Sequence, residues 1–225
     1  DISFKAKKGQ TIAVIGSTGS GKSTLINLIP RYYDVTKGSV KVDGVDVRDM
    51  TQKELRDKLG YVPQKGVLFS GTINSNIRYG KPEITDAQVK EAAEVAQATE
   101  FIDTKPEKYE SPVSQGGTNV SGGQKQRLSI ARAIAKDPEI FIFDDSFSAL
   151  DFKTDSQLRK ALKEYTKDAT TVIVAQRIST ILGADQIIVL DDGHMAGIGT
   201  HKELMANCEV YQQIARSQLS EEELA

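Results

Sequence analysis

The sequence predicts an α/β fold with a mostly parallel sheet, an antiparallel portion near the N-terminus and an inserted α-helical lobe. Expected strands and helices alternate along most of the chain, which is typical of a parallel sheet covered by helices. The dipeptide Asp43-Gly44 lies in an alternating stretch and predicts a hairpin. Between residues 85 and 136, runs of β-branched residues disappear and the apolar spacing becomes helical. We expect one domain over 1–225, with a core from 1–84 and 137–225 and the lobe from 85–136.

Each expected strand of the core is short and apolar, and several helices carry a stop or cap signal. Pro30 ends the first helix, because proline cannot continue an α-helix. Thr51, with Glu54 three residues later, is a capping-box pattern at a helix start. We expect the chain end at 221–223 to be solvated. The expected elements are strands over 2–5 and 11–15 joined by a turn at Lys8-Gly9-Gln10, helices over 22–29, 51–59 and 154–165, a hairpin over 39–47, and strands over 60–62, 139–144, 170–175 and 186–190.

Composition limits the classes of function. The chain has 29 basic and 31 acidic residues, so it lacks the basic excess typical of nucleic-acid binding, and we expect no nucleic-acid partner. Its longest clear apolar run, 140–143, is far shorter than the ~20 residues needed to cross a bilayer. A single cysteine, Cys208, excludes an internal disulfide and fits a reducing compartment. We therefore expect a soluble, cytoplasmic chain whose membrane role would come through a partner.

A glycine-rich stretch between an expected strand and an expected helix predicts a phosphate-binding loop. Its glycines let several backbone N–H groups point at one anion, and the dipole of the following helix adds to the attraction. We expect Lys22 to reach the β- and γ-phosphates of a nucleotide and the Ser23 hydroxyl to bind Mg²⁺. The stretch therefore predicts a P-loop NTPase core that binds ATP. Its residues are Gly16-Ser17-Thr18-Gly19-Ser20-Gly21-Lys22-Ser23, followed by Thr24.

An acidic residue at the end of an apolar strand supplies the second half of such a site. Residues 140–143 are Ile-Phe-Ile-Phe, and Asp144 follows them. We expect Asp144 to hold Mg²⁺ through water, as a Walker B acid does. A strand that ends in aspartate is common, so the prediction depends on its pairing with the P-loop.

Three further stretches narrow the family. They stand in the order that the family has, and the resemblance covers nearly the whole chain. It implies that Gln64 is both a catalytic residue and a Mg²⁺ ligand. The stretch Val120-Ser121-Gly122-Gly123-Gln124-Lys125-Gln126-Arg127 resembles the signature sequence of ABC ATPases, Tyr61-Val62-Pro63-Gln64 resembles their Q-loop, and Ser148-Ala149-Leu150-Asp151 resembles their D-loop.

The signature residues have a physical rationale of their own. Ser121, Gly122 and Gly123 precede an expected helix, so a hydroxyl and backbone N–H groups can bind an anion at its N-terminus. Taken alone, these residues are equally typical of a simple helix cap. The resemblance implies that residues 121–124 contact the γ-phosphate of ATP held by a second nucleotide-binding domain. Two ATP molecules would then lie between two domains arranged head to tail.

Other stretches resemble the exporter branch of the ABC family. They are Phe69-Ser70-Gly71-Thr72-Ile73, Gly199-Thr200-His201 and Glu203-Leu204. The resemblance implies a transmembrane domain, fused or on a separate chain, as a partner near the Q-loop. It also implies a place on the cytoplasmic face of the cell membrane. His201 is then expected to start a helix and not to act as a catalyst.

Two positions depart from the family pattern at catalytic sites. Asp145 stands where the family has glutamate, so its carboxylate is set back by ~1.5 Å, and displacements near 1 Å can cost on the order of a hundredfold in rate. Gln176 stands where the family has histidine, and an amide cannot carry charge or move a proton. The pair resembles the degenerate half of heterodimeric multidrug-type exporters. We expect slow turnover, with Asp145, Gln176 and Gln64 as catalytic residues and a different subunit as the second nucleotide-binding domain.

Two lesser departures concern the loop before the signature and the adenine site. Gln115 stands where exporters often have glutamate. The family's adenine-stacking aromatic would precede the P-loop, but Phe4, the sole aromatic residue there, fits a core strand better. We therefore expect the chain to be a piece of a longer protein.

The resemblance favours a motor domain that binds and hydrolyses ATP to drive export through transmembrane partners, and three alternative functions compete with it. A soluble ABC ATPase of DNA repair or chromosome maintenance would carry coiled-coil insertions and a basic face, and the sequence has no heptad run. A P-loop kinase of small molecules has no use for the stretch 120–127 before Asp144. A regulatory nucleotide sensor stays open, because Asp145 and Gln176 fit tight binding without turnover.

Overall fold

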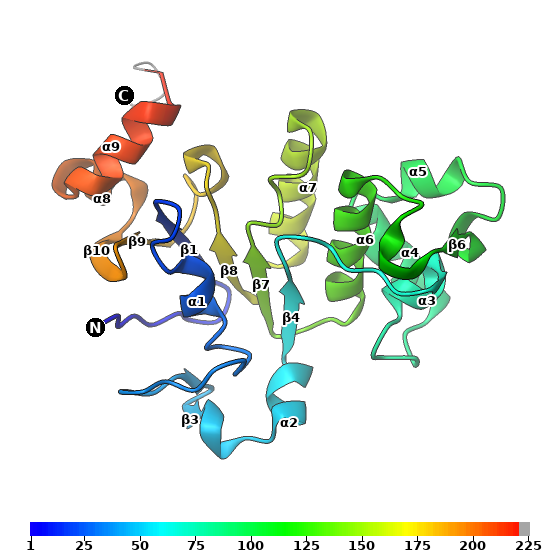
Figure 1. Cartoon of the computed structure of the whole chain (residues 1–225), viewed down its shortest axis with the longest axis horizontal. Coiled ribbons are helices and arrows are strands. Elements are labelled where there is room, and N and C mark those ends of the chain that lie inside the picture. The colour runs from blue at the N-terminus through cyan, green and yellow to red at the C-terminus, as the bar shows by residue number, and fades with distance from the viewer. Residues whose placement is uncertain (221–225) are drawn as a thin grey trace.

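A six-stranded sheet with the strand order β10-β9-β1-β8-β7-β4 forms the centre of the computed structural model, which describes residues 1–220 (Figure 1). Neighbouring strands are parallel, except that β10 runs antiparallel to β9. The predicted α/β fold with a mostly parallel sheet is therefore confirmed. The strands are β1 (Thr11–Gly16), β4 (Leu59–Val62), β7 (Ile140–Asp144), β8 (Thr170–Val174), β9 (Gln186–Asp191) and β10 (His194–Gly199).

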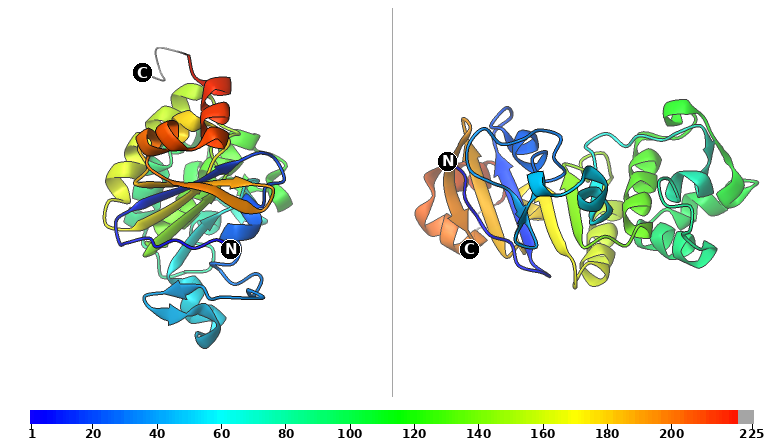
Figure 2. Two further views of the ribbon diagram at one scale, coloured as in Figure 1. Left: turned by 90° about the vertical axis from the view of Figure 1, so that its left-hand side faces the viewer. Right: turned by 90° about the horizontal axis from the view of Figure 1, so that it is seen from below.

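The helices gather at the two ends of the sheet as well as on its faces. Helices α3 to α6 lie beyond β4 and β7, and α8 and α9 lie at the opposite end, beside β9 and β10 (Figures 1 and 2). None of the helices within residues 1–220 has the length and apolarity that crossing a bilayer requires. The helices are α1 (Lys22–Ile26), α2 (Gln52–Asp57), α3 (Ile73–Ile77), α4 (Asp86–Val95), α5 (Thr99–Asp103), α6 (Gly122–Ala135), α7 (Phe152–Tyr165), α8 (His201–Asn207) and α9 (Glu209–Gln218), with short 3₁₀ turns η1 (Val47–Asp49), η2 (Lys108–Glu110), η3 (Gln115–Gly117) and η4 (Ile178–Thr180).

Two small antiparallel pairs accompany the central sheet. Strand β2 (Lys41–Val42) pairs with β3 (Val45–Asp46), and the predicted turn residues Asp43 and Gly44 have φ angles of 52° and 81°. The hairpin prediction is confirmed, since two successive positive φ angles are typical of a tight hairpin turn. The second pair joins β5 (Gly71–Thr72) to β6 (Pro112–Val113).

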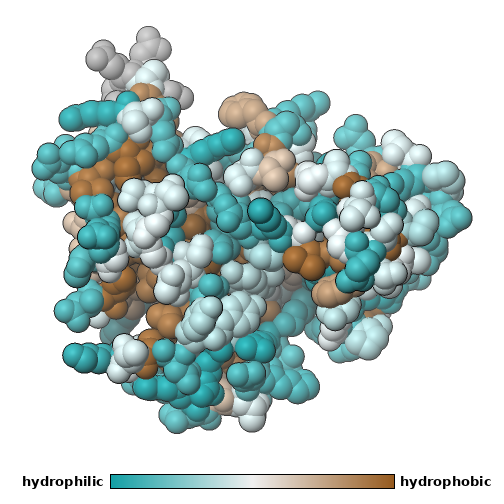
Figure 3. Space-filling model, in the orientation of Figure 1, coloured by the Kyte–Doolittle hydropathy of each residue, from teal (hydrophilic) through white to brown (hydrophobic). Residues whose placement is uncertain are grey.

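Alternation along each strand sends side chains into separate apolar clusters. On β1, Ile12 and Val14 pack into one cluster while Ala13 and Ile15 pack into another that includes α8 and α9. On β7, Phe141 and Phe143 join a third cluster with α3, α4 and α6. The surface outside these clusters is mostly hydrophilic on the face in Figure 3, in keeping with a charged fraction of 27%.

Three predictions near the N-terminal half are wrong in detail. Residues 2–5 form no strand; Ile2 and Phe4 are half-buried against the β1 cluster, so the alternation reflects packing without sheet pairing. The first helix stops at Ile26, and tighter turns with i to i−3 hydrogen bonds continue toward Pro30. The helix after Thr51 ends at Asp57, and Leu59 opens β4 instead.

The C-terminal part holds elements that the sequence pattern did not predict. Strand β10, which begins at His194, and helix α9 are additions. The prediction that His201 starts a helix is confirmed, because α8 begins there with Thr200 as its cap. The predicted solvated end at 221–223 lies outside the described residues.

Candidate functional site

The glycine-rich loop lies between the end of β1 and the start of α1, as the sequence predicts. A Cβ added at Gly16 would come within 2.2 Å of the carbonyl oxygen of Leu190, so a larger residue would displace backbone. Gly21, the N-cap of α1, has a φ of 96°, a conformation that other residues rarely adopt. Glycine at position 16 therefore lets the loop pack closely against Leu190, and glycine at position 21 lets the chain turn into α1.

Lys22 folds back over this loop. Its Nζ donates to the carbonyl oxygens of Gly16 at 3.0 Å and Ser17 at 2.7 Å. Burial lowers the pKa of the Lys22 amine, while the carboxylates of Asp145 and Asp144 oppose that shift. The two carbonyl bonds are ones that an anionic ligand could replace.

The loop also contains a buried hydroxyl without a hydrogen-bond partner among the described residues. Ser20 Oγ is buried and makes no hydrogen bond within residues 1–220. Such orphaned atoms are rare in folded proteins and call for an explanation. Ser20 Oγ lies beside Gly16, on the same side as the carbonyl of Leu190. The group of the loop that fits a phosphate chain is Lys22, whose two carbonyl bonds an anion could replace.

The end of β7 meets the start of α1 at a hydroxyl–carboxylate pair. Ser23 Oγ donates to Asp144 Oδ1 at 2.9 Å, and the Tyr61 hydroxyl donates to Asp144 Oδ2 at 3.3 Å. Within residues 1–220 no group of three or more His, Cys, Asp and Glu side chains could hold a metal by itself. A hydroxyl and one carboxylate match Mg²⁺, which keeps several waters and takes further ligands from substrate phosphates.

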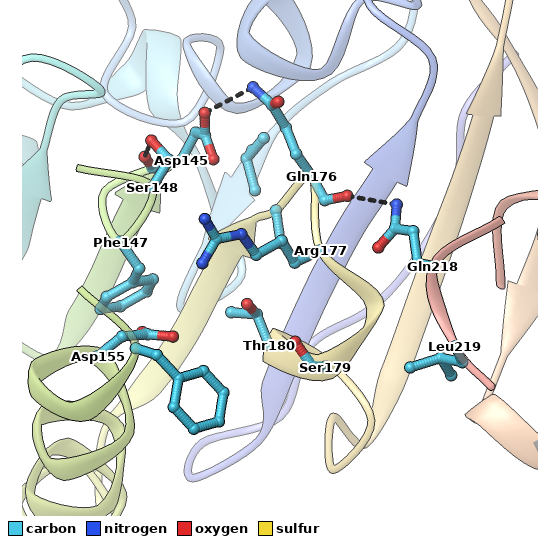
Figure 4. A pocket seen from close by; sticks show the side chains of 13 residues that line it. Asp145, Phe147, Ser148, Asp155, Gln176, Arg177, Ser179, Thr180, Gln218 and Leu219 are labelled. Carbon is cyan, nitrogen blue, oxygen red and sulfur yellow. Dashed lines mark hydrogen bonds between the residues drawn. The ribbon is translucent and has the colours of Figure 1, made fainter. Parts of the chain in front are cut away.

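Two amides converge on the next residue, Asp145. Gln64 Nε2 donates to Asp145 Oδ2 at 3.0 Å. Gln176 Nε2 donates to the same oxygen at 2.7 Å, a bond that Figure 4 shows. The backbone of Asp145 has a φ of 47°, and its N–H donates to the carbonyl of Val174 at 3.0 Å. The structure thus joins Gln64 to Asp145, with which the resemblance groups it as a catalytic residue. The Mg²⁺ role that the resemblance also implies for Gln64 stays a prediction.

Burial and hydrogen bonding act on Asp145 in opposite directions. Burial raises the pKa of the Asp145 carboxyl above its ordinary value, and the charge of Asp144 adds to that rise. Hydrogen bonds with Gln64, Ser148 and Gln176 favour the ionised form and lower the pKa, but burial is the largest of these effects.

A cavity of about 530 Å³ opens beside Asp145 and the predicted D-loop (Figure 4). Ser148 Oγ donates to the Asp145 carbonyl at 3.0 Å, and Asp151 caps α7 by accepting from the N–H of Thr154. Ala149 and Leu150 complete the predicted D-loop, and Leu150 packs into the cluster shared with α6. The cavity is lined by Asp145, Phe147, Ser148, Phe152, Asp155, Val174, Ala175, Gln176, Arg177, Ser179, Thr180, Gln218 and Leu219.

The predicted signature residues lie at the start of α6. Ser121 accepts from the N–H of Gln124, and the Gln124 side chain accepts in turn from the N–H of Ser121, each at 3.2 Å. Ser121 and Gly122 are exposed, while Gly123 is half-buried. Helix α6 lies across β7 and β4 from α1 (Figure 1). The structure therefore does not bring this motif to the phosphate loop of the same chain.

Two glutamines hold loops of the site in a role that the sequence analysis did not predict. Buried Gln126 of α6 accepts from the N–H of Gly66 at 2.8 Å and donates to the carbonyl of Pro63 at 3.0 Å, next to Gln64. Gln218, at the end of α9, bonds the backbone around Gln176. Gln126 lies in the signature-like stretch, but its spacing does not reveal its partners, and Gln218 lies in no motif; each bonds backbone atoms far away in the chain.

Comparison with known proteins identifies the group to which these features belong. The chain matches the family model described as ABC transporter over residues 1–148. An ABC transporter ATP-binding protein of Mycobacterium tuberculosis is 50% identical over 221 residues, which make up 97% of this chain and 38% of that protein. A Staphylococcus aureus protein named as a multidrug export ATP-binding/permease protein is 47% identical over 214 residues, 95% of this chain and 37% of its own length.

A solved structure gives the same likeness in three dimensions. A bacterial Atm1-family ABC exporter with ATP bound matches with a TM-score of 0.91 and 39% sequence identity. The match covers 95% of this chain and 38% of that one. The chain thus spans less than two fifths of the length of each of these relatives.

Proposed function

This chain belongs to the ABC transporter family, and from that premise we propose that it is the ATP-binding and ATP-hydrolysing motor domain of a multidrug-type exporter. The observation that carries the proposal is the pairing of Ser23 with Asp144 beside a glycine-rich loop over which Lys22 folds back. Relatives named for ATP binding and multidrug export support the same function.

Different residues of the site bind the phosphates of the nucleotide and its Mg²⁺. The N–H groups of the loop over 16–24 and the Lys22 amine bind the phosphates, with Lys22 exchanging its carbonyl partners for phosphate oxygens. Ser23 and Asp144 hold Mg²⁺, with Gln64 as a further ligand. Bound Mg²⁺ would neutralise the charge that develops between the β- and γ-phosphates. The chain's own residues therefore bind and orient the triphosphate.

The signature motif serves a partner and not its own phosphate loop. Because α6 lies away from α1, Ser121 to Gln124 contact ATP on a second nucleotide-binding domain, placed head to tail. A transmembrane domain contacts the surface near residues 69–73, where Gln115 Oε1 accepts from the N–H of Ser70 at 3.2 Å. We place the assembled transporter with this domain on the cytoplasmic face of the cell membrane.

We propose that turnover at this chain's own site is slow. Asp145 is one methylene shorter than glutamate, and the oxygen Oδ2 already accepts hydrogen bonds from two amides. A carboxylate engaged in this way is poorly placed to orient or deprotonate an attacking water. The site is then the degenerate one of a pair, and the partner subunit is a different chain.

Steady-state ATP hydrolysis at saturating Mg-ATP tests both parts of the proposal. We expect slow hydrolysis by the wild type and markedly faster hydrolysis by the Asp145→Glu/Gln176→His variant, with Lys22→Ala as the inactive control. Fast hydrolysis by the wild type would contradict the degenerate site while leaving the motor function intact. Equal ATP affinity of the wild type and the Lys22→Ala variant in a binding titration would contradict the motor function itself.

A further inference from the structure

Gln218, the last residue of α9, forms two hydrogen bonds with the backbone of the loop that follows β8. Gln218 Oε1 accepts from the N–H of Ile178 at 2.8 Å, and Gln218 Nε2 donates to the carbonyl of Gln176, also at 2.8 Å. One side-chain amide therefore uses both of its polar ends on backbone atoms two residues apart. Figure 4 shows the bond between Gln218 and Gln176 at the edge of the cavity.

The hydrogen bond from the Ile178 N–H to Gln218 contributes to stability because Ile178 is fully buried. A buried backbone N–H that loses its partner carries the full desolvation penalty of that group. Gln218 supplies this partner from a position 40 residues further along the chain. Residues 176–178 thus depend on a distant helix for their conformation.

Helix α9 is itself firmly placed, so its last residue is a fixed point. Tyr211 and Ala215 are fully buried in the cluster that also contains Ala13, Ile15 and Ile178. The Tyr211 hydroxyl lies 2.7 Å from His201 Nδ1, which links α9 to the start of α8. Gln218 therefore follows the position of a packed helix.

The same residue that Gln218 holds by its backbone reaches Asp145 by its side chain. Gln176 Nε2 lies 2.7 Å from Asp145 Oδ2, and Gln64 approaches that oxygen from the opposite loop. An unbroken series of contacts thus leads from α9 through Gln176 to Asp145. We propose that Gln218 is a positioning residue, through which the C-terminal helix sets where Gln176 lies relative to Asp145.

The structural part of this proposal stands on the contacts above, and its effect on turnover rests on the proposed function. Amide hydrogen exchange tests the structural part. In Gln218→Ala, we expect exchange of the Ile178 N–H to become at least about tenfold faster, because its acceptor is gone. In Gln218→Glu, a carboxylate oxygen still accepts from Ile178, so protection should remain. Gln213→Ala is the matched control, since Gln213 is exposed on the same helix and bonds only within it, to Glu209.

Turnover is best measured in the Asp145→Glu/Gln176→His background, where position 176 still has the backbone carbonyl that Gln218 bonds. Adding Gln218→Ala should lower kcat about tenfold and leave KM within about twofold, because the phosphate loop is untouched. Adding Gln218→Glu should also lower kcat, since the donor to the carbonyl at position 176 is lost.

Two results would overturn the proposal. Unchanged exchange at Ile178 in Gln218→Ala would show that the amide does not hold the loop. Exchange that rises equally at buried amides of β1 and β8 would show that the substitution loosens the whole fold. If the background variant proves inactive, the expected gain from glutamate at position 145 and histidine at position 176 is contradicted, and the hydrogen-exchange result still decides the role of Gln218.

Discussion

Ser23 and Asp144 are 121 residues apart in the sequence, yet the hydroxyl of one donates to the carboxylate of the other. Replacing Ser23 with alanine removes the hydroxyl without disturbing the backbone N–H groups of the loop. We expect Ser23→Ala to weaken nucleotide binding in the presence of Mg²⁺ about tenfold, which corresponds to about 1.4 kcal/mol. Titration with a fluorescent ATP analogue, with Mg²⁺ or with excess EDTA, measures this effect.

The comparison with EDTA is the internal control for Ser23. Without Mg²⁺, the wild type and the Ser23→Ala variant should bind with nearly equal affinity, because the hydroxyl then has no metal to serve. An equal loss of affinity in both conditions would mean that Ser23 acts on the loop conformation and not on a cation.

The buried carboxyl of Asp145 should make the stability of the chain depend on pH. Because burial raises its pKa above the ordinary value of 3.8, the folded state binds this proton more readily than the unfolded state. Below pH 3.8 the carboxyl is protonated in both states and does not affect the unfolding free energy. As the pH rises past 3.8 and then past the higher folded-state pKa, ionisation of Asp145 lowers the unfolding free energy. Asparagine carries no charge, so Asp145→Asn should have a higher Tm at pH 7.5. A gain of about 1 kcal/mol corresponds to roughly 2–4 °C for a chain of this size.

The advantage of Asp145→Asn should shrink as the pH falls from 7.5 toward the ordinary value of 3.8, because the raised pKa lets the carboxyl take up a proton in the folded state first. Thermal unfolding followed by circular dichroism at both pH values measures it. Asp168→Asn is the control, because Asp168 is exposed, and it should change Tm little at either pH. An advantage of equal size at both pH values would contradict a penalty from buried charge.

Residues with local motifs were predictable, and residues that act at a distance were not. The glycine-rich loop with Lys22 and Ser23, and Asp144 after its apolar strand, follow from spacing alone. The meeting of Gln64 and Gln176 on one oxygen of Asp145 depends on how three loops fold together. Gln218 is the extreme case, since its partners are backbone atoms that any residue possesses.

At the scale of elements, a comparison of two helix caps distinguishes an effect on stability from an effect on nucleotide binding. Ser121 at the start of α6 and Thr85 at the start of α4 each make a capping box with the third residue of the helix. Loss of such a cap typically costs about 1 kcal/mol. We therefore expect Ser121→Ala and Thr85→Ala to lower Tm by similar amounts, roughly 2–4 °C each.

Of these two cap residues, only Ser121 belongs to the segment that we propose contacts nucleotide on a partner domain. In a complex with that partner, Ser121→Ala should slow ATP hydrolysis at the partner's site, whereas Thr85→Ala should not. If the two variants slow hydrolysis equally, Ser121 is a cap and nothing more.

Elements were predictable where propensity and burial agree. Strand β7 and helix α7 have strong local patterns, whereas residues 2–5 alternate as a strand does but form no sheet pairing. Local alternation reports which side chains face the core and cannot report whether a neighbouring strand is present. Strand β10 was missed for the opposite reason: its burial alternates between half-buried and exposed, and two of its residues, Gly197 and Gly199, lack side chains that would mark it.

For the whole molecule, β7 is the element that unites the site with both sides of the fold. Ile142 packs into the cluster around β1, while Phe141 and Phe143 pack into the cluster of the helical lobe. The same strand ends in Asp144, which bonds Ser23 at the start of α1. A ligand held between the phosphate loop and Asp144 would therefore restrain elements that belong to separate apolar clusters.

Ligand binding should consequently raise the stability of the cooperative unit as a whole. At a free Mg-ATP concentration 100 times its Kd, binding adds about 2.7 kcal/mol to the unfolding free energy. This corresponds to a rise in Tm of roughly 5–10 °C for a chain of this size. Differential scanning fluorimetry measures the rise, which should be larger for ATP than for ADP and nearly absent for AMP, because the loop binds phosphates. Lys22→Ala should lose the rise with ATP, and an equal response of this variant and the wild type would place the nucleotide somewhere other than the loop.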